Sequence, residues 1–101
     1  MLTKSQIISQ IASVQSELKE RFELEHLYLY GSYALEKQNE ESDIDLMYVM
    51  QTNSKMTLGR LQKLEDKLKA LLHVPKIEMV NQKYMNPVIA NQIESYVIRL
   101  F

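Results

Sequence analysis

Two long stretches of the chain carry apolar residues at steps of three and four positions, with polar residues between them. This spacing places the apolar side chains on one face of a helix, and it predicts amphipathic helices over about residues 4–23 and 57–72. Thr3 or Ser5 is suited to cap the first helix, and Thr57 the second, because their hydroxyl groups accept hydrogen bonds from free backbone N–H groups. Both apolar faces are interpreted as core. The periodic positions are Ile7, Ile8, Ile11, Val14, Leu18 and Phe22 in the first helix, and Leu58, Leu61, Leu64, Leu68, Leu71 and Leu72 in the second.

Short apolar and aromatic runs predict strands between these helices and after the second one. Gly31 ends the first run, and Pro75 ends the second long helix. Pro87 is suited to the first turn of a last helix, where its missing N–H would have no helical partner. Strands thus alternate with helices, so we expect a sheet covered by helices on at least one face. The predicted strands are 26–30, 43–50 and 76–80, with a possible closing strand in 96–101, and the predicted shorter helices are 32–38 and 87–95.

The composition is that of one globular domain spanning residues 1–101. Hydrophobic residues make up 46% of the chain and charged residues 25%, which argues against disorder. The absence of cysteine excludes disulfides and a thiolate nucleophile. No apolar run is long enough to span a bilayer, and the N-terminal residues do not resemble a signal peptide, so we expect a cytoplasmic protein. The net charge of −1 argues against stable, direct nucleic-acid binding.

The first candidate chemistry is a pair of acids at the start of the predicted strand 43–50. Because side chains alternate along a strand, Asp43 and Asp45 would point the same way, with their Cα atoms about 6.5 Å apart. Two like charges on one face repel each other, and a divalent cation such as Mg²⁺ would relieve this repulsion. The alternative is a solvated strand end whose acids only protect an edge.

The turn before these acids favours the metal interpretation. Gly31 can adopt backbone angles closed to other residues and lets a phosphate approach the main chain. Ser32 supplies a hydroxyl at the start of a short predicted helix, whose first N–H groups favour an anion. A Gly-Ser turn followed by Asp-x-Asp, with a strand before each, therefore predicts a site for a metal–nucleotide complex.

The stretch "GSYALEKQNEESDIDL", residues 31–46, resembles the signature of the DNA-polymerase-β-like nucleotidyltransferase superfamily, and most of all its minimal nucleotidyltransferases. The resemblance implies an α+β palm fold, with a small mixed sheet and helices packed mainly on one face. It implies a third carboxylate on the strand after the long helix, and the matching position is Glu78. Asp43, Asp45 and Glu78 would then be both metal ligands and catalytic residues, holding two Mg²⁺ ions with ATP or another nucleoside triphosphate as substrate.

The resemblance also implies which residues contact the nucleotide. Gly31 and Ser32 would hold phosphates, and Tyr33 could stack on a base, although burial against the sheet is the alternative interpretation. The family commonly has Arg and Gly shortly after Gly-Ser, whereas this chain has Leu35 and Glu36. Lys37 could replace the arginine, or it could be an exposed helix residue.

In the family, the usual partner is a HEPN-domain toxin, to which the nucleotidyltransferase transfers AMP as antitoxin. The resemblance therefore implies a protein adenylyltransferase that works in a hetero-complex, or in an oligomer of its own. Two alternatives stay open: a binding module that neutralises its partner by contact, and a small-molecule nucleotidyltransferase working with a partner subunit.

Overall fold

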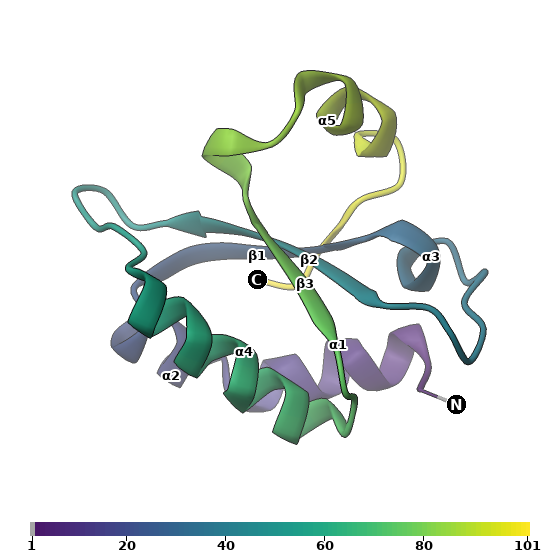
Figure 1. The fold of residues 1–101 in the computed structure, drawn as a ribbon, viewed down its shortest axis with the longest axis horizontal. Helices are drawn as coiled ribbons and strands as arrows, with labels where there is room; N and C mark the ends of the chain where they lie inside the picture. Colours follow the sequence, from purple (N-terminus) through teal and green to yellow (C-terminus); the bar gives the residue numbers. More distant parts are fainter. Residues whose placement is uncertain (1) are drawn as a thin grey trace.

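The computed structural model describes residues 2–101 (Figure 1). A four-stranded mixed sheet forms the middle of the molecule, with helices on both of its faces. The elements in chain order are α1 (Lys4–Ser13), α2 (Gln15–Arg21), β1 (Leu24–Tyr30), α3 (Gly31–Ala34), β2 (Ile44–Met50), α4 (Leu58–Leu72), β3 (Ile77–Asn81), a 3₁₀ turn η1 (Gln82–Tyr84), α5 (Pro87–Ile93) and β4 (Ile98–Arg99). Within this part of the chain, no helix has the length and apolar character needed to cross a membrane.

The long helices follow the sequence pattern, with one correction. Thr3 caps α1, and its hydroxyl accepts a hydrogen bond from the backbone N–H of Gln6, whose side chain in turn accepts one from the Thr3 N–H. The prediction of one continuous helix over 4–23 is wrong, because the chain leaves helical geometry at Val14 (φ −118°, ψ 12°). Just before this break, the Ser13 hydroxyl donates to the Gln10 carbonyl, a contact that bends helices. Ile7 and Leu18 remain fully buried on either side of it.

The strand order in the sheet is β3-β2-β1-β4. β1 runs antiparallel to both β2 and β4, whereas β2 and β3 are parallel and are joined by α4. β1 begins at Leu24, earlier than predicted, and a register irregularity between Leu24 and His26 lets both Leu24 and Leu27 point into the core. The short helix predicted over 32–38 is limited to α3, and the closing strand to β4.

The two faces of the sheet have different surroundings. α1, α2 and α4 cover one face, which is the mixed-sheet arrangement expected from the resemblance, and α5 stands alone over the other (Figure 1). The helix-covered face holds the main hydrophobic core, to which Leu29, Leu46 and Leu68 contribute fully buried side chains. Along the strands, the residues on either side of Leu29 and Leu46 point to the other face of the sheet, which we call the open face. The open face is where the candidate chemistry lies.

Candidate active site

Strand register brings one residue from each of three strands into a single row on the open face. Asp45 pairs with Tyr30 on β1 and with Glu78 on β3. On either side of Asp45 along β2, Ile44 and Leu46 are buried in the core, so Asp45 points the opposite way. The carboxyl of Asp45 shares a hydrogen bond with Glu78. Two of the three acids predicted from the sequence are therefore direct neighbours, although 33 positions separate them in the chain.

The electrostatics of this row show an excess of negative charge. Partial burial raises the pKa of Asp45 to about 7, with further contributions from the hydrogen bond to Glu78 and from the charges of Glu78 and Asp43. Burial also raises the pKa of Tyr30 to about 12, and the charges of Asp45 and Glu78 add to this shift. A cation bound in the row would favour the ionised form of Asp45 and offset these costs.

Gly31 presses the main chain of the turn against this acid. Its φ of +75° lies in the left-handed region that favours glycine. A Cβ atom built at Gly31 would lie 2.1 Å from Asp45 Oδ2 and 3.0 Å from Asp45 Cγ. Only a residue without a side chain fits between the turn and the carboxylate. The two parts of the sequence motif, the Gly-Ser turn and the Asp-x-Asp strand, therefore meet in space.

Asp43 lies one residue before β2, and its carboxylate faces a different partner. Its Oδ2 is 3.2 Å from the ammonium Nζ of Lys76, which lies one residue before β3. Across residues 2–101, no three His, Cys, Asp or Glu side chains are grouped so as to hold a metal ion. The donor set nevertheless fits Mg²⁺ chemistry, because Asp45 and Glu78 present adjacent hard oxygen donors whose shared charge calls for a cation. Asp43, the third predicted ligand, is paired with Lys76 instead.

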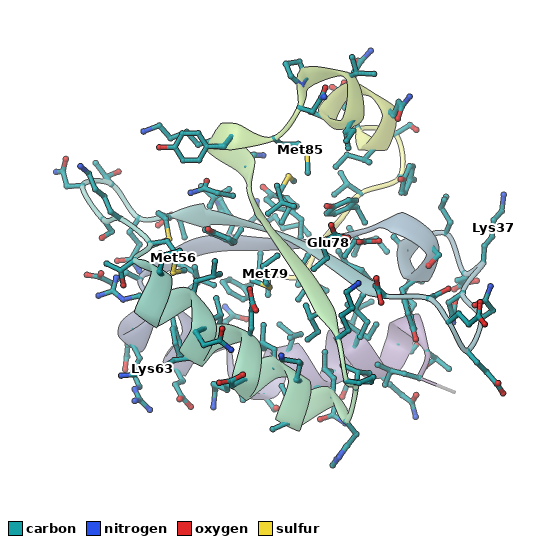
Figure 2. The ribbon with its side chains drawn as sticks, viewed as in Figure 1. Lys37, Met56, Lys63, Glu78, Met79 and Met85 are labelled. Carbon is teal, nitrogen blue, oxygen red and sulfur yellow. The ribbon has the colours of Figure 1, made fainter. Side chains whose placement is uncertain are left out.

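The remaining predicted residues have different surroundings. Ser32 lies in α3 beside Gly31 and is partly exposed. Tyr33 belongs to the hydrophobic core with only 5% of its surface exposed, which leaves no ring face free for a base and favours the core interpretation. Lys37 is exposed and extends into solvent beyond α3, whereas Glu78 lies on β3 (Figure 2). Leu35, at the position of the usual arginine, is 42% exposed.

Sequence reasoning missed two residues at this site. Tyr30 immediately precedes the Gly-Ser turn, and its place in the row follows from the pairing of β1 with β2. Lys76 stands two positions before Glu78, as Asp43 stands two positions before Asp45. That parallel spacing is a signal in the sequence, but it becomes informative only when the two strands are known to lie side by side.

A comparison with known protein families gives the family to which a chain with this site belongs. The profile described as "Polymerase beta, Nucleotidyltransferase" matches residues 12–101. The chain belongs to this nucleotidyltransferase family. The match includes the Gly31 turn and all three candidate carboxylates.

Named relatives of this nucleotidyltransferase are similar over nearly their full lengths. A protein of Methanocaldococcus jannaschii, provisionally named a protein adenylyltransferase, is 30% identical over 97% of this chain and 98% of its own. The protein adenylyltransferase MntA of Thermococcus cleftensis is 29% identical over 92% of this chain and 91% of its own.

Solved structures share the fold of this nucleotidyltransferase. One is provisionally described as a minimal nucleotidyltransferase, with a TM-score of 0.77, 24% identity, and coverage of 96% of this chain and 95% of its own. A chain of a toxin–antitoxin crystal structure with AMP-PNP has a TM-score of 0.73 and 21% identity, covering 93% and 72%. A chain of the complex between the tri-AMPylated HEPN toxin of Shewanella oneidensis and its MNT antitoxin has a TM-score of 0.68 and 18% identity, covering 98% and 72%.

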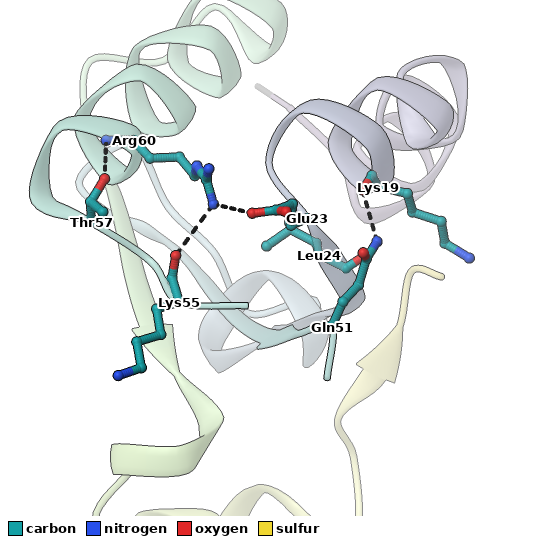
Figure 3. A network of polar contacts seen from close by, with 7 residues as sticks. All are labelled: Lys19, Glu23, Leu24, Gln51, Lys55, Thr57 and Arg60. Atoms are coloured by element: carbon teal, nitrogen blue, oxygen red, sulfur yellow. Dashed lines mark hydrogen bonds and ion pairs between the residues drawn. The ribbon is translucent and has the colours of Figure 1, made fainter. Parts of the chain in front are cut away.

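Two of the molecule's cavities differ in their relation to the candidate site. A cleft of about 470 Å³ opens beside the row, between the open face at Met47 and the α5 segment at Pro87, Ala90 and Ile93. A larger cavity of about 640 Å³ lies between α2 and α4, away from the carboxylates. Arg60, which lines this larger cavity, donates hydrogen bonds to Glu23 and to the Lys55 carbonyl (Figure 3). We therefore interpret the charged side chains around the larger cavity as a structural network. The smaller cleft shares the open face with the candidate site, because Met47 lies two positions after Asp45 on β2.

Proposed function

We propose that this nucleotidyltransferase transfers AMP from ATP to a hydroxyl group of a partner protein, a HEPN-domain toxin, and so acts as its antitoxin. The observation that carries the proposal is the Asp45–Glu78 carboxylate pair on the open face, whose Asp45 lies against the Gly31 turn. The names of the relatives and of the fold neighbours agree with this chemistry.

The reaction joins the acceptor oxygen to the α-phosphorus of ATP and breaks the bond from that phosphorus to the leaving pyrophosphate. Two bound Mg²⁺ ions would neutralise the triphosphate and lower the pKa of the acceptor hydroxyl. Asp43, Asp45 and Glu78 would hold them, and Glu78 would also accept the proton of the hydroxyl. Because the main chain at Gly31 touches Asp45, the turn can bind phosphate oxygens through its backbone N–H groups, with the Ser32 hydroxyl beside them.

Tyr30 has a supporting role in this scheme. With its pKa raised to about 12, the phenol stays neutral at physiological pH. A neutral phenol is a weak nucleophile but a good hydrogen-bond donor, so Tyr30 can orient Asp45 or a phosphate oxygen without competing with the acceptor. In this scheme the Tyr30 phenol is a hydrogen-bond donor, and a different hydroxyl, on the partner, receives AMP.

A second candidate function is neutralisation of the partner by contact alone. Two observations favour it: Leu35 replaces the usual arginine, and η1 and α5 carry exposed apolar side chains at Tyr84, Val88 and Ile89. η1 and α5, which carry these side chains, lie over the open face of the sheet (Figure 1), and a partner could cover the exposed apolar groups there. Contact and transfer use different residues and can be separated experimentally.

The test incubates the protein with ATP, Mg²⁺ and the product of the adjacent gene, and measures the intact mass of both proteins. We expect the partner to gain the mass of AMP with the wild type and with Asp66→Asn, an exposed acid on α4. We expect no gain with Asp45→Asn. No mass gain on the partner with the wild type would refute the transferase. Neutralisation of the partner by Asp45→Asn, which transfers no AMP, would support the contact mechanism.

A further inference from the structure

The candidate site has a cation among its own side chains, the ammonium group of Lys76. Its Nζ lies 3.2 Å from Asp43 Oδ2, and the pair stands at the end of the sheet where Ile44 and Ile77 open the parallel register of β2 and β3. Within residues 2–101, Lys76 is the only basic side chain that forms an ion pair with Asp43, Asp45 or Glu78. Of the three predicted metal ligands, Asp43 is therefore the one that pairs with a basic side chain.

The other cations near the motif are placed differently. Leu35 stands where the family has arginine, and Lys37 extends away from the site into solvent (Figure 2). Lys4 forms an ion pair with Glu36, with its Nζ 3.0 Å from Glu36 Oε1. A triphosphate brought to the Gly31 turn would meet no basic side chain from these positions, although an ammonium or guanidinium group would add a charge-assisted hydrogen bond to its phosphates.

We propose that Lys76 exchanges partners during nucleotide binding: it holds Asp43 in the absence of ligand, and it binds the β- and γ-phosphates when Asp43 turns to Mg²⁺. This inference rests on the proposed function, because it assigns the triphosphate recognition of that same site. Each charged group keeps a partner of opposite charge in this exchange. Asp43 would leave the ammonium for Mg²⁺, and the ammonium of Lys76 would bind a phosphate oxygen.

Little free energy is needed to separate Lys76 from Asp43. The side chain of Lys76 is 71% exposed and that of Asp43 is 35% exposed, so their ion pair is solvated and contributes little stability. The lysine stem is long and flexible, so its ammonium can swing between an acid and a phosphate at the same strand end. Because only the β- and γ-phosphates would gain this contact, Lys76 would select nucleoside triphosphates over monophosphates.

The test measures binding by calorimetry for the full-length wild type, Lys76→Met, Lys76→Arg and the control Lys69→Met. Lys69 forms a comparable surface pair with Asp66, on α4. In Lys76→Met, we expect Mg²⁺ alone to bind up to about fivefold more tightly, because a competing cation is gone. We expect ATP with Mg²⁺ to bind about tenfold more weakly, because a charged contact to phosphate is lost. AMP binding should be unchanged, and Lys76→Arg should restore most of the ATP affinity.

Opposite shifts for the metal and the nucleotide are the signature of the exchange. Weaker binding of both ligands would indicate general damage to the site and overturn the inference, as would no change in either. Thermal unfolding checks that Lys76→Met is folded, which its exposure leads us to expect.

The outcome is separable from that of the proposed function. If Asp45-dependent AMP transfer occurs while Lys76→Met binds both ligands like the wild type, the exchange fails and the transferase stands. If the opposite shifts are found but no partner gains AMP, the exchange stands as a property of the nucleotide site and the transferase fails.

Discussion

Replacing Gly31 by alanine tests whether the turn and the acid are built to fit each other. The new Cβ would lie 2.1 Å from Asp45 Oδ2, whereas contacts under 3.0 Å are essentially never seen, so the carboxylate must retreat by about 1 Å. The φ of +75° adds about 1–2 kcal/mol of backbone strain for any residue with a Cβ. Because Asp45 is partly exposed at the strand end, the carboxylate can yield by turning, and we expect a total loss of about 1–3 kcal/mol.

Gly59→Ala provides a matched control with the opposite sign. Gly59 is exposed in the first turn of α4, and a Cβ there would meet nothing within 4 Å. Alanine at this position should stabilise the protein by about 0.5 kcal/mol, because it lowers the entropy of the unfolded chain and favours the helix. The same chemical change is therefore expected to lower stability at one glycine and raise it at the other.

The assays are thermal unfolding and calorimetric binding of ATP with Mg²⁺. For a domain of this size, about 1 kcal/mol corresponds to a Tm shift of about 4–8 °C, so Gly31→Ala should lower Tm by at least about 4 °C. We also expect Gly31→Ala to lose at least about tenfold in Mg–ATP affinity, since about 1 Å of misplacement disturbs the ligand set. Gly59→Ala should bind like the wild type. Equal Tm shifts in the two variants, or unchanged Mg–ATP affinity in Gly31→Ala, would refute the geometric reasoning.

Three further predictions follow from the fold and from the raised pKa of Asp45. The pKa of Asp45 is raised from 3.8 to about 7 on folding, so the unfolded chain loses this proton first, and the metal-free protein should lose stability as pH rises from about 4 to about 7. Asp45→Asn should remove this loss of stability with pH. After solvent screening is allowed for, we expect the variant to be about 1 kcal/mol more stable than the wild type at pH 8 but not at pH 4. Urea unfolding measures the difference, and a variant that is less stable than the wild type at pH 8 would contradict the reasoning. Leu68→Ala should cost about 2–5 kcal/mol in the same assay, because Leu68 is fully buried in the core on α4; a loss under 1 kcal/mol would show a loosely packed core. Thr57→Ala should cost about 1 kcal/mol, because the Thr57 hydroxyl accepts the Arg60 N–H at the start of α4, whereas Thr57→Ser should retain most of the stability.

The sequence by itself determined most of the local structure. The three- and four-residue spacing of apolar positions gave the bounds of α4 to within one residue, and Thr57 and Pro87 take the capping and first-turn positions assigned to them. These features depend on neighbours within one helical turn, so they can be recognised without the rest of the chain. Residues 31–46 indicated the nucleotidyltransferase family for the same reason, because a Gly-Ser turn and two acids at alternate positions are local patterns.

Tertiary structure alone decided how those residues combine. The crossover through α4 makes β2 and β3 parallel, and their register places Glu78 beside Asp45 and the ammonium of Lys76 near Asp43. Tyr33 is next to Ser32 in the chain but lies in the core, because α3 turns its ring inward. Register and burial depend on contacts between residues tens of positions apart, and local periodicity contains no information about which distant residue will lie opposite.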